Sequence, residues 1–240
     1  MQIMDNGWRV LAGTCVMMIG SAVADAATIY VPQGFDSGKA EGWSGASGSA
    51  APKVMASGGP QGAGDEYLLA TSLGGGGRGS HLAVYQTSAA WVGDLQGAGA
   101  KGLSVDLMNP TSSQPLTMRL VVFGPRVNES RWTSTAALSI PNDGQWHRFY
   151  FPLGSSVMTR VAGNASYDQT AKGALRLMLR HDTLTPSSGG TAIRAQLGID
   201  NIALVPEPAG GVLLATGNLV LIGVAGCLFG RRRARGQRID

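Results

Sequence analysis

Apolar and polar residues alternate with a period of two in several short segments of this chain, which is the spacing of a half-buried β-strand. In the segment 116–123 every second residue is large and apolar, so Leu116, Met118, Leu120 and Val122 share one face. In the segment 175–180 the three leucines are expected to face a core and the two arginines to face solvent. These segments predict strands of a sheet that is buried on one side.

Other segments extend this pattern. An aromatic segment, 146–151, follows the turn sequence Pro-Asn-Asp-Gly at 141–144. Further candidate strands are 27–31, 66–71, 81–86, 102–107, 135–140 and 195–205. About nine short strands joined by Gly-, Pro-, Asn- and Ser-rich loops predict an all-β fold, a jelly-roll-like antiparallel β-sandwich that spans residues 27–204.

The N-terminal segment 1–26 departs from the strand pattern. One acid and one base in residues 1–9 precede a short apolar stretch, 10–20, and the small residues of 21–26 follow. This order is typical of a secretory signal peptide. The apolar stretch is too short to span a membrane comfortably, so export is expected rather than an uncleaved anchor.

The C-terminal segment 205–240 contains an uncharged apolar run, 209–230, of 22 residues. At about 1.5 Å per residue a helix of this length spans the roughly 30 Å of bilayer hydrocarbon. The sequence therefore predicts one transmembrane helix over 209–230. An ordinary tail anchor would account for these physical features alone.

The order of motifs in this tail is more specific. It runs Pro206, Glu207, Pro208, the apolar segment, and then Arg231, Arg232 and Arg233. This order resembles the PEP-CTERM sorting signal of Gram-negative bacteria. The resemblance implies an exosortase substrate, delivered by the secretion machinery through an inner-membrane intermediate to the cell surface or extracellular matrix.

Charge and cysteine content limit what the middle of the chain can do. Residues 27–205 carry 13 Lys and Arg against 11 Asp and Glu, while five arginines lie in the tail. The near-neutral balance argues against nucleic-acid binding. Cys15 and Cys227 both lie outside the predicted sandwich, which therefore has neither a disulfide nor a thiolate nucleophile.

Catalytic motifs are absent from the sequence. No His-Glu-x-x-His, Gly-x-Ser-x-Gly or phosphate-loop sequence occurs, and the three histidines are isolated. The carboxylates are scattered over predicted loops and strand ends. We therefore predict no catalytic residue and no enzyme activity.

A second resemblance concerns the middle of the chain. The strings Phe35-Asp36 and Glu41-Gly42-Trp43, the aromatic segment 145–153 and the closing segment 197–204 are similar to galactose-binding-like and laminin-B-like jelly-roll modules. First and last strands often lie side by side in a jelly roll, which would bring Asp36 near Asp200. Two carboxylates suit Ca²⁺, and the resemblance implies that such an ion is a structural staple. The alternative is that Asp36 starts a turn and Asp200 bonds a loop.

Carbohydrate binding would require an exposed aromatic ring as a platform. Tyr85, Trp91 and Trp132 are the candidates, because they lie near polar predicted loops. The alternative is burial in the core, where such rings are often found.

The first expectation for function is a non-catalytic, exported structural or matrix-associated domain that contacts extracellular polysaccharide or other proteins. The alternative is a carbohydrate-binding module with calcium as staple. A surface polysaccharide hydrolase is a distant third.

Overall fold

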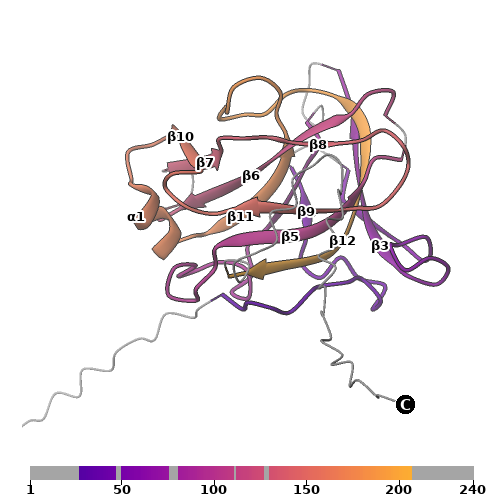
Figure 1. Ribbon diagram of the computed structural model, residues 1–240, viewed down its shortest axis with the longest axis horizontal. Coiled ribbons are helices and arrows are strands. Elements are labelled where there is room, and N and C mark those ends of the chain that lie inside the picture. The colour runs from indigo at the N-terminus through magenta and orange to yellow at the C-terminus, as the bar shows by residue number, and fades with distance from the viewer. Residues whose placement is uncertain (1–26, 47–49, 76–80, 111, 127–129, 207–240) are drawn as a thin grey trace, which may run out of the picture. The chain divides into compact units, whose positions relative to one another are not determined.

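Two antiparallel β-sheets packed face to face form the domain, as seen in a computed structural model that describes residues 27–46, 50–75, 81–110, 112–126 and 130–206 (Figure 1). The seven-stranded sheet has the order β1 (Ser44–Gly45), β4 (Ala83–Gln86), β11 (Arg176–His181), β6 (Leu116–Gly124), β7 (Ser130–Ser134) and β10 (Met158–Ala162), and β8 (Leu138–Ile140) also pairs with β6. The five-stranded sheet has the order β2 (Lys53–Met55), β3 (Tyr67–Leu73), β12 (Arg194–Val205), β5 (Gly102–Met108) and β9 (His147–Pro152). The predicted all-β sandwich is confirmed.

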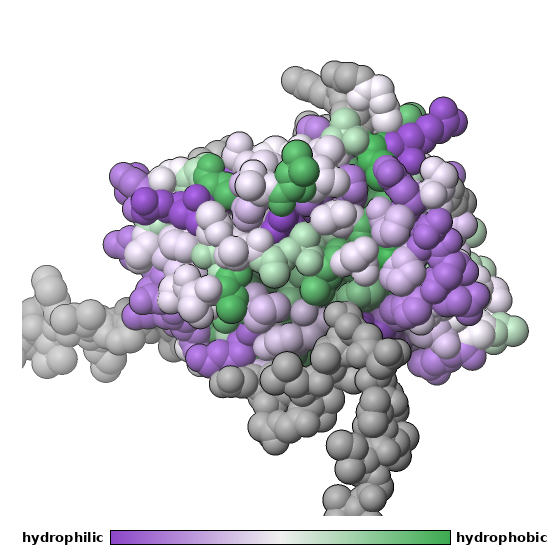
Figure 2. Space-filling view, turned by 45° about the horizontal axis from the view of Figure 1, so that its top comes forward, coloured by the Kyte–Doolittle hydropathy of each residue, from purple (hydrophilic) through white to green (hydrophobic). Residues whose placement is uncertain are grey.

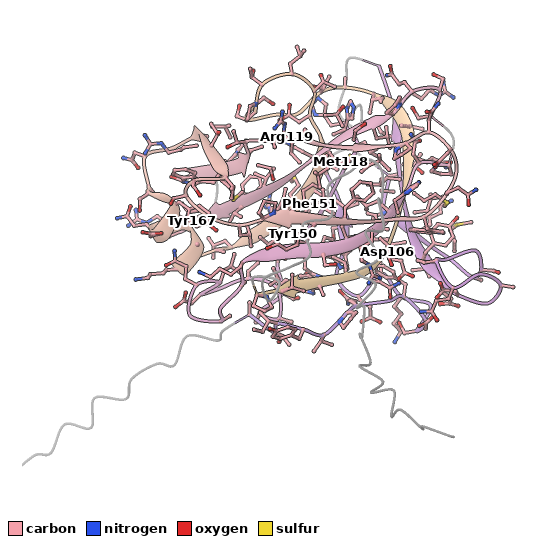
Figure 3. All side chains as sticks on the ribbon, in the orientation of Figure 1. Asp106, Met118, Arg119, Tyr150, Phe151 and Tyr167 are labelled. Atoms are coloured by element: carbon pink, nitrogen blue, oxygen red, sulfur yellow. The ribbon has the colours of Figure 1, made fainter. Side chains whose placement is uncertain are left out.

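The core lies between the two sheets and follows the two-residue alternation. Leu116, Met118, Leu120 and Val122 of β6 are all fully buried, as predicted. Met118 and Phe151 of β9 both belong to this core and come from opposite sheets (Figure 3). Burying a side chain of this size contributes about 1.5–3 kcal/mol, so packing between the sheets stabilises the sandwich.

The start and the end of the domain lie side by side, as a jelly roll requires. The Gln33 amide donates to the Ile202 carbonyl at 2.8 Å, and the Tyr30 amide donates to the Leu204 carbonyl at 2.9 Å. These bonds place the segment before Asp36 next to β12. The expected strand over 27–31 is wrong, however, because this segment makes isolated bonds and no continuous ladder.

Several other elements differ from the sequence expectation. The strand expected over 135–140 begins only at Leu138, and β1, β2, β7 and β10 were not predicted. A helix, α1 (Tyr167–Lys172), was also not predicted; it begins at the N-cap Ser166, whose side chain and that of Gln169 form a capping box. In the segment 175–180, Leu175 is 37% exposed where burial was expected, and Arg180 is only 3% exposed where exposure to solvent was expected.

Figure 2 shows one face of the domain, where hydrophobic residues form small separate groups among polar ones. On this face no single broad apolar surface dominates.

The predicted ends of the chain lie outside the described residues. They are the signal peptide 1–26 and the tail from Glu207 onward, including the predicted membrane helix 209–230. No helix in the ranges that the structure describes is long and apolar enough to cross a membrane.

Candidate functional site

The outer face of the seven-stranded sheet carries a row of arginine and aromatic side chains. Alternation sends Leu177 and Leu179 of β11 into the core, so the residues between them lie on the opposite face. Pairing then sets Arg176 of β11 opposite Phe123 of β6, and Phe123 opposite Arg131 of β7. Three strands thus contribute one Arg–Phe–Arg row across the sheet.

The two arginines of this row stack on aromatic rings. The guanidinium carbon of Arg176 lies 4.6 Å from the centroid of the Tyr85 ring and 5.2 Å from that of Phe123. Arg131 lies 5.2 Å from the centroid of Phe123. Cations within about 6 Å of a ring centroid are attracted to the ring face, so the rings and guanidinium groups hold one another in place.

The side chain of Arg176 is half-buried, and stacking on these two rings is the interaction that holds it. In the part of the chain that the structure describes, it forms no hydrogen bond and no ion pair. Its N–H donors are therefore not engaged by the described protein groups. A guanidinium carries five such donors in a rigid plane.

These residues line a surface hollow of about 340 Å³. Its lining consists of Ala46, His81, Ala83, Tyr85, Phe123, Arg131, Arg176, Met178, Arg180, Ser188 and Gly189. The floor is the outer face of β4, β11 and β6, and the last two residues belong to the loop after β11.

That loop, 182–191, is fixed to the sheet by Asp182. The Asp182 carboxylate accepts from the Ser187 amide at 3.0 Å and from the Ser187 hydroxyl at 2.9 Å. It also pairs with Arg180 at 3.2 Å. Asp182 and Arg180 are both buried, so this end of the hollow rests on a closed polar network rather than on solvated side chains.

Two arginines complete the network. Arg180 donates to the Ser187 and Ser188 carbonyls. Arg119, on the neighbouring strand, donates to the Leu184 carbonyl at 2.6 Å and to the Ser134 carbonyl at 2.7 Å (Figure 3). Burial lowers the pKa of Arg180 from its ordinary value, while the nearby Asp182 carboxylate raises it. The fixed loop defines the shape of one wall.

Of the three aromatic residues predicted as platforms, only Tyr85 lies in the hollow. Trp91 is buried and packs edge-on against Trp43 at 5.3 Å between centroids, so the expectation of an exposed ring there is wrong. Trp132 lies on the inner side of β7, where its indole N–H donates to the Ala165 carbonyl at 3.2 Å. Both tryptophans shape the core.

Phe123, Arg131 and Arg176 were not predicted as site residues. The period-two pattern placed Arg176 on the outer face, but its partner rings come from strands far apart in sequence. Only the strand order, with β11 between β4 and β6, brings them together.

Asp36 and Asp200, the predicted metal ligands, face one small space beside Gly34. A methyl group added at Gly34 would lie 3.4 Å from Asp36 Oδ2 and 3.6 Å from Asp200 Oδ1. Asp200 is 1% exposed, and its Oδ1 has no hydrogen-bond partner within the described ranges. A buried carboxylate oxygen without a partner is costly, and a cation would satisfy it.

The electrostatics at Asp200 agree with this geometry. Burial is the largest influence on the pKa of Asp200 and raises it; the Asn201 backbone lowers it, and the nearby carboxylates of Asp65, Asp36 and Asp106 raise it. Together these effects raise the pKa of Asp200 to about 6. Asp106 is itself neutralised by Arg148, which donates to its two oxygens at 2.8 and 2.7 Å. No group of three or more His, Cys, Asp or Glu side chains among the described residues could hold a metal ion, so protein oxygens other than carboxylates would have to complete any coordination shell.

No family model matches the chain, and no curated protein matches it. Solved structures that match include an exo-β-agarase, at 12% identity and a TM-score of 0.49, which covers 75% of this chain and 26% of that chain. The family 11 carbohydrate-binding module from Clostridium thermocellum, in complex with a β-1,3-1,4-mixed-linked tetrasaccharide, matches at 13% identity and a TM-score of 0.46, over 78% of this chain and 98% of that one. The CBM22-1 xylan-binding domain from Paenibacillus barcinonensis Xyn10C matches at 15% identity and a TM-score of 0.43, over 76% and 98%.

These comparisons correct the first expectation for function, a structural or matrix-associated domain. Carbohydrate-binding modules stand among the matching structures. At 12–15% identity the likeness concerns the fold. The case for a ligand therefore rests on the residues of the hollow.

Proposed function

We propose that this domain is a carbohydrate-binding module whose ligand lies across the outer face of the seven-stranded sheet. The observation that carries the proposal is the half-buried Tyr85 ring at the hollow, stacked with Arg176 and bordered by Phe123. The part of the Tyr85 ring that Arg176 leaves uncovered would offer a flat apolar surface to a sugar ring. Guanidinium donors at its edge can bond sugar oxygens.

The hollow fits this use in size and construction. Its volume, about 340 Å³, lies within the range of small-molecule sites. Its floor consists of paired strands, and the loop 182–191 is held by a buried network. Sites built on rigid elements lose little entropy when they bind, which suits a module that only binds.

Calcium forms the second part of the proposal. Asp36 and Asp200 would hold the ion beside Gly34, where the unpartnered Asp200 Oδ1 and the Asp36 Oδ2 both lie within contact distance of one added methyl group. A bound Ca²⁺ would neutralise these carboxylates and join the N-terminal segment to β12. This would stabilise a domain that has no disulfide.

The proposal also includes that the protein is exported and that it binds its ligand without catalysing a reaction. The signal peptide 1–26 and the PEP-CTERM-like tail, with Pro206, Glu207, Pro208 and Arg231 to Arg233, support delivery by an exosortase to the cell surface. Extracellular polysaccharide is then the accessible ligand class. No catalytic motif in the sequence supports turnover.

The test is a glycan array followed by titration of the full-length protein with the best polysaccharide. Tyr85→Ala is expected to weaken binding at least tenfold, because it removes the platform. Tyr30→Ala serves as the matched control, since Tyr30 is 65% exposed and does not line the hollow. Saturable binding that both variants retain would contradict the location of the site, and an absence of binding to every glycan would contradict the function.

A further inference from the structure

We infer that the ligand of the hollow is an acidic polysaccharide, one that carries carboxylate or sulfate groups. This inference rests on the proposed function and names the ligand class for the same site. It follows from the kind of polar side chains that line the hollow.

Three of the lining residues are arginines, namely Arg131, Arg176 and Arg180, and no Asp, Glu, Asn or Gln side chain is among the lining residues that the structure describes. A neutral sugar presents hydroxyl groups, which both donate and accept hydrogen bonds. Sites for neutral sugars therefore need acceptors as well as donors. A surface dominated by guanidinium donors matches a group that only accepts, such as a carboxylate or a sulfate.

Within the described ranges, the protein supplies a counterion to Arg180 but none to Arg176. Arg180 has a counterion, the buried Asp182 at 3.2 Å. Arg176 has no ion pair in the ranges that the structure describes, and its neighbours are the rings of Tyr85 and Phe123. Aromatic rings orient a guanidinium but do not cancel its charge.

Burial strengthens this preference. Arg176 is half-buried between two rings. Charges at a partly desolvated surface attract an anion more strongly than charges in water.

The geometry also orients the anion. The register places Arg176 and Arg131 on either side of Phe123, and both guanidinium groups lie 5.2 Å from the centroid of that ring. A planar guanidinium binds a carboxylate through two parallel N–H bonds. An acidic sugar could therefore pack against the part of the Tyr85 ring that Arg176 leaves uncovered, while its charged group is bound by Arg176.

The experiment compares polysaccharides that differ in charge but share a backbone. Polygalacturonate is paired with its methyl-esterified form, and dextran sulfate with dextran, each titrated into the full-length protein. The wild type is expected to bind the acidic member of at least one pair at least tenfold more tightly. In Arg176→Gln this preference should fall severalfold while the melting temperature stays near that of the wild type.

Arg160→Gln is the matched control, because Arg160 lies on β10 and does not line the hollow. It should leave the preference intact. Two results would show that the protein acts as a nonspecific ion exchanger and would overturn the inference. One is an equal loss of the preference in both arginine variants. The other is binding of the acidic polysaccharide that 0.5 M NaCl abolishes but Tyr85→Ala leaves unchanged.

The test separates the inference from the proposed function. Equal binding of neutral and acidic members, lost in Tyr85→Ala, would overturn the acidic ligand and leave the carbohydrate-binding function standing. No binding of any polysaccharide, here or on the glycan array, would overturn both.

Discussion

At the residue scale, Asp200 is a buried carboxylic acid, and its burial is energetically unfavourable. The other buried residues of its strand are apolar, and one oxygen of Asp200 has no partner within the described part of the chain. Its raised pKa, about 6, shows that burial and neighbouring carboxylates disfavour its charged form. Natural domains retain such a residue where it has a ligand or a specific structural role.

Gly34→Ala tests the calcium proposal with one methyl group. That methyl would lie in ordinary contact with both carboxylate oxygens and would fill the space between them. We expect millimolar Ca²⁺ to raise the melting temperature of the wild type by several degrees, and this rise to be lost in Gly34→Ala and Asp200→Asn.

Gly154→Ala is the control, because its added methyl would meet only Val157, at 3.6 Å. Scanning calorimetry with Ca²⁺ and with EDTA measures the shifts. A calcium response of equal size in all variants would rule out this site, and no response in the wild type would rule out the staple.

His181 should make the domain sensitive to acid. Burial lowers its pKa in the folded state, against weaker raising effects of the Thr191 carbonyl and Asp182. Below about pH 6.5 the unfolded chain therefore binds a proton that the folded chain resists, so stability falls as the pH drops through this range.

His181→Gln keeps a hydrogen-bonding side chain but cannot titrate. Between pH 7.5 and pH 5, the melting temperature of His181→Gln should fall less than that of the wild type. His81→Gln, at an exposed histidine, should follow the wild type. Parallel curves for all three proteins would show that His181 does not contribute to the acid response.

At the scale of elements, the loop 182–191 is held to the sheet by a buried network that contains one carboxylate, that of Asp182. Arg180 and Arg119 both reach this loop, and Asp182 is their buried counterion. Removing one partner of such a network leaves uncompensated buried charge, which costs about 3–5 kcal/mol.

Asp182→Ala is therefore expected to lower the free energy of unfolding by about 3–5 kcal/mol in urea titrations. Asp143→Ala, which breaks the exposed Asp143–His147 pair, should change little. A cost for Asp182→Ala that is no larger than that for Asp143→Ala would contradict the role of the network. Where Asp182→Ala fails to fold, Asp182→Asn should show an intermediate loss.

The sequence predicted those elements in which alternation runs long enough to be seen. The strands β6, β11 and β12 were found from their patterns, and β6 buries the four residues that alternation selected. The strands β1 and β2, of two and three residues, are too short to show a period. Arg180 was expected to be exposed, but it is buried on the outer face, because its bonds to Asp182 and to the loop 182–191 compensate its charge.

At the scale of the whole domain, the sequence predicted single site residues but not their assembly. The approach of Asp36 to Asp200 was anticipated, because the first and last segments of a jelly roll meet. Tyr85, one of the three predicted platforms, lines the hollow, and its role there stays a prediction. The Arg–Phe–Arg row was not, because β4, β6, β7 and β11 come together only through the strand order of the sheet. Trp91 was misplaced because a tryptophan near polar loops can still point into the core.

The most direct test of the central claim, that the outer face of the seven-stranded sheet binds carbohydrate, is hydrogen–deuterium exchange of the full-length protein. Exchange would be measured with and without a saturating concentration of the polysaccharide selected on the glycan array. We predict slower exchange in β4, in β11 and in the loop 182–191, with the five-stranded sheet unchanged. Protection confined to the five-stranded sheet, or no protection at saturation, would contradict the account.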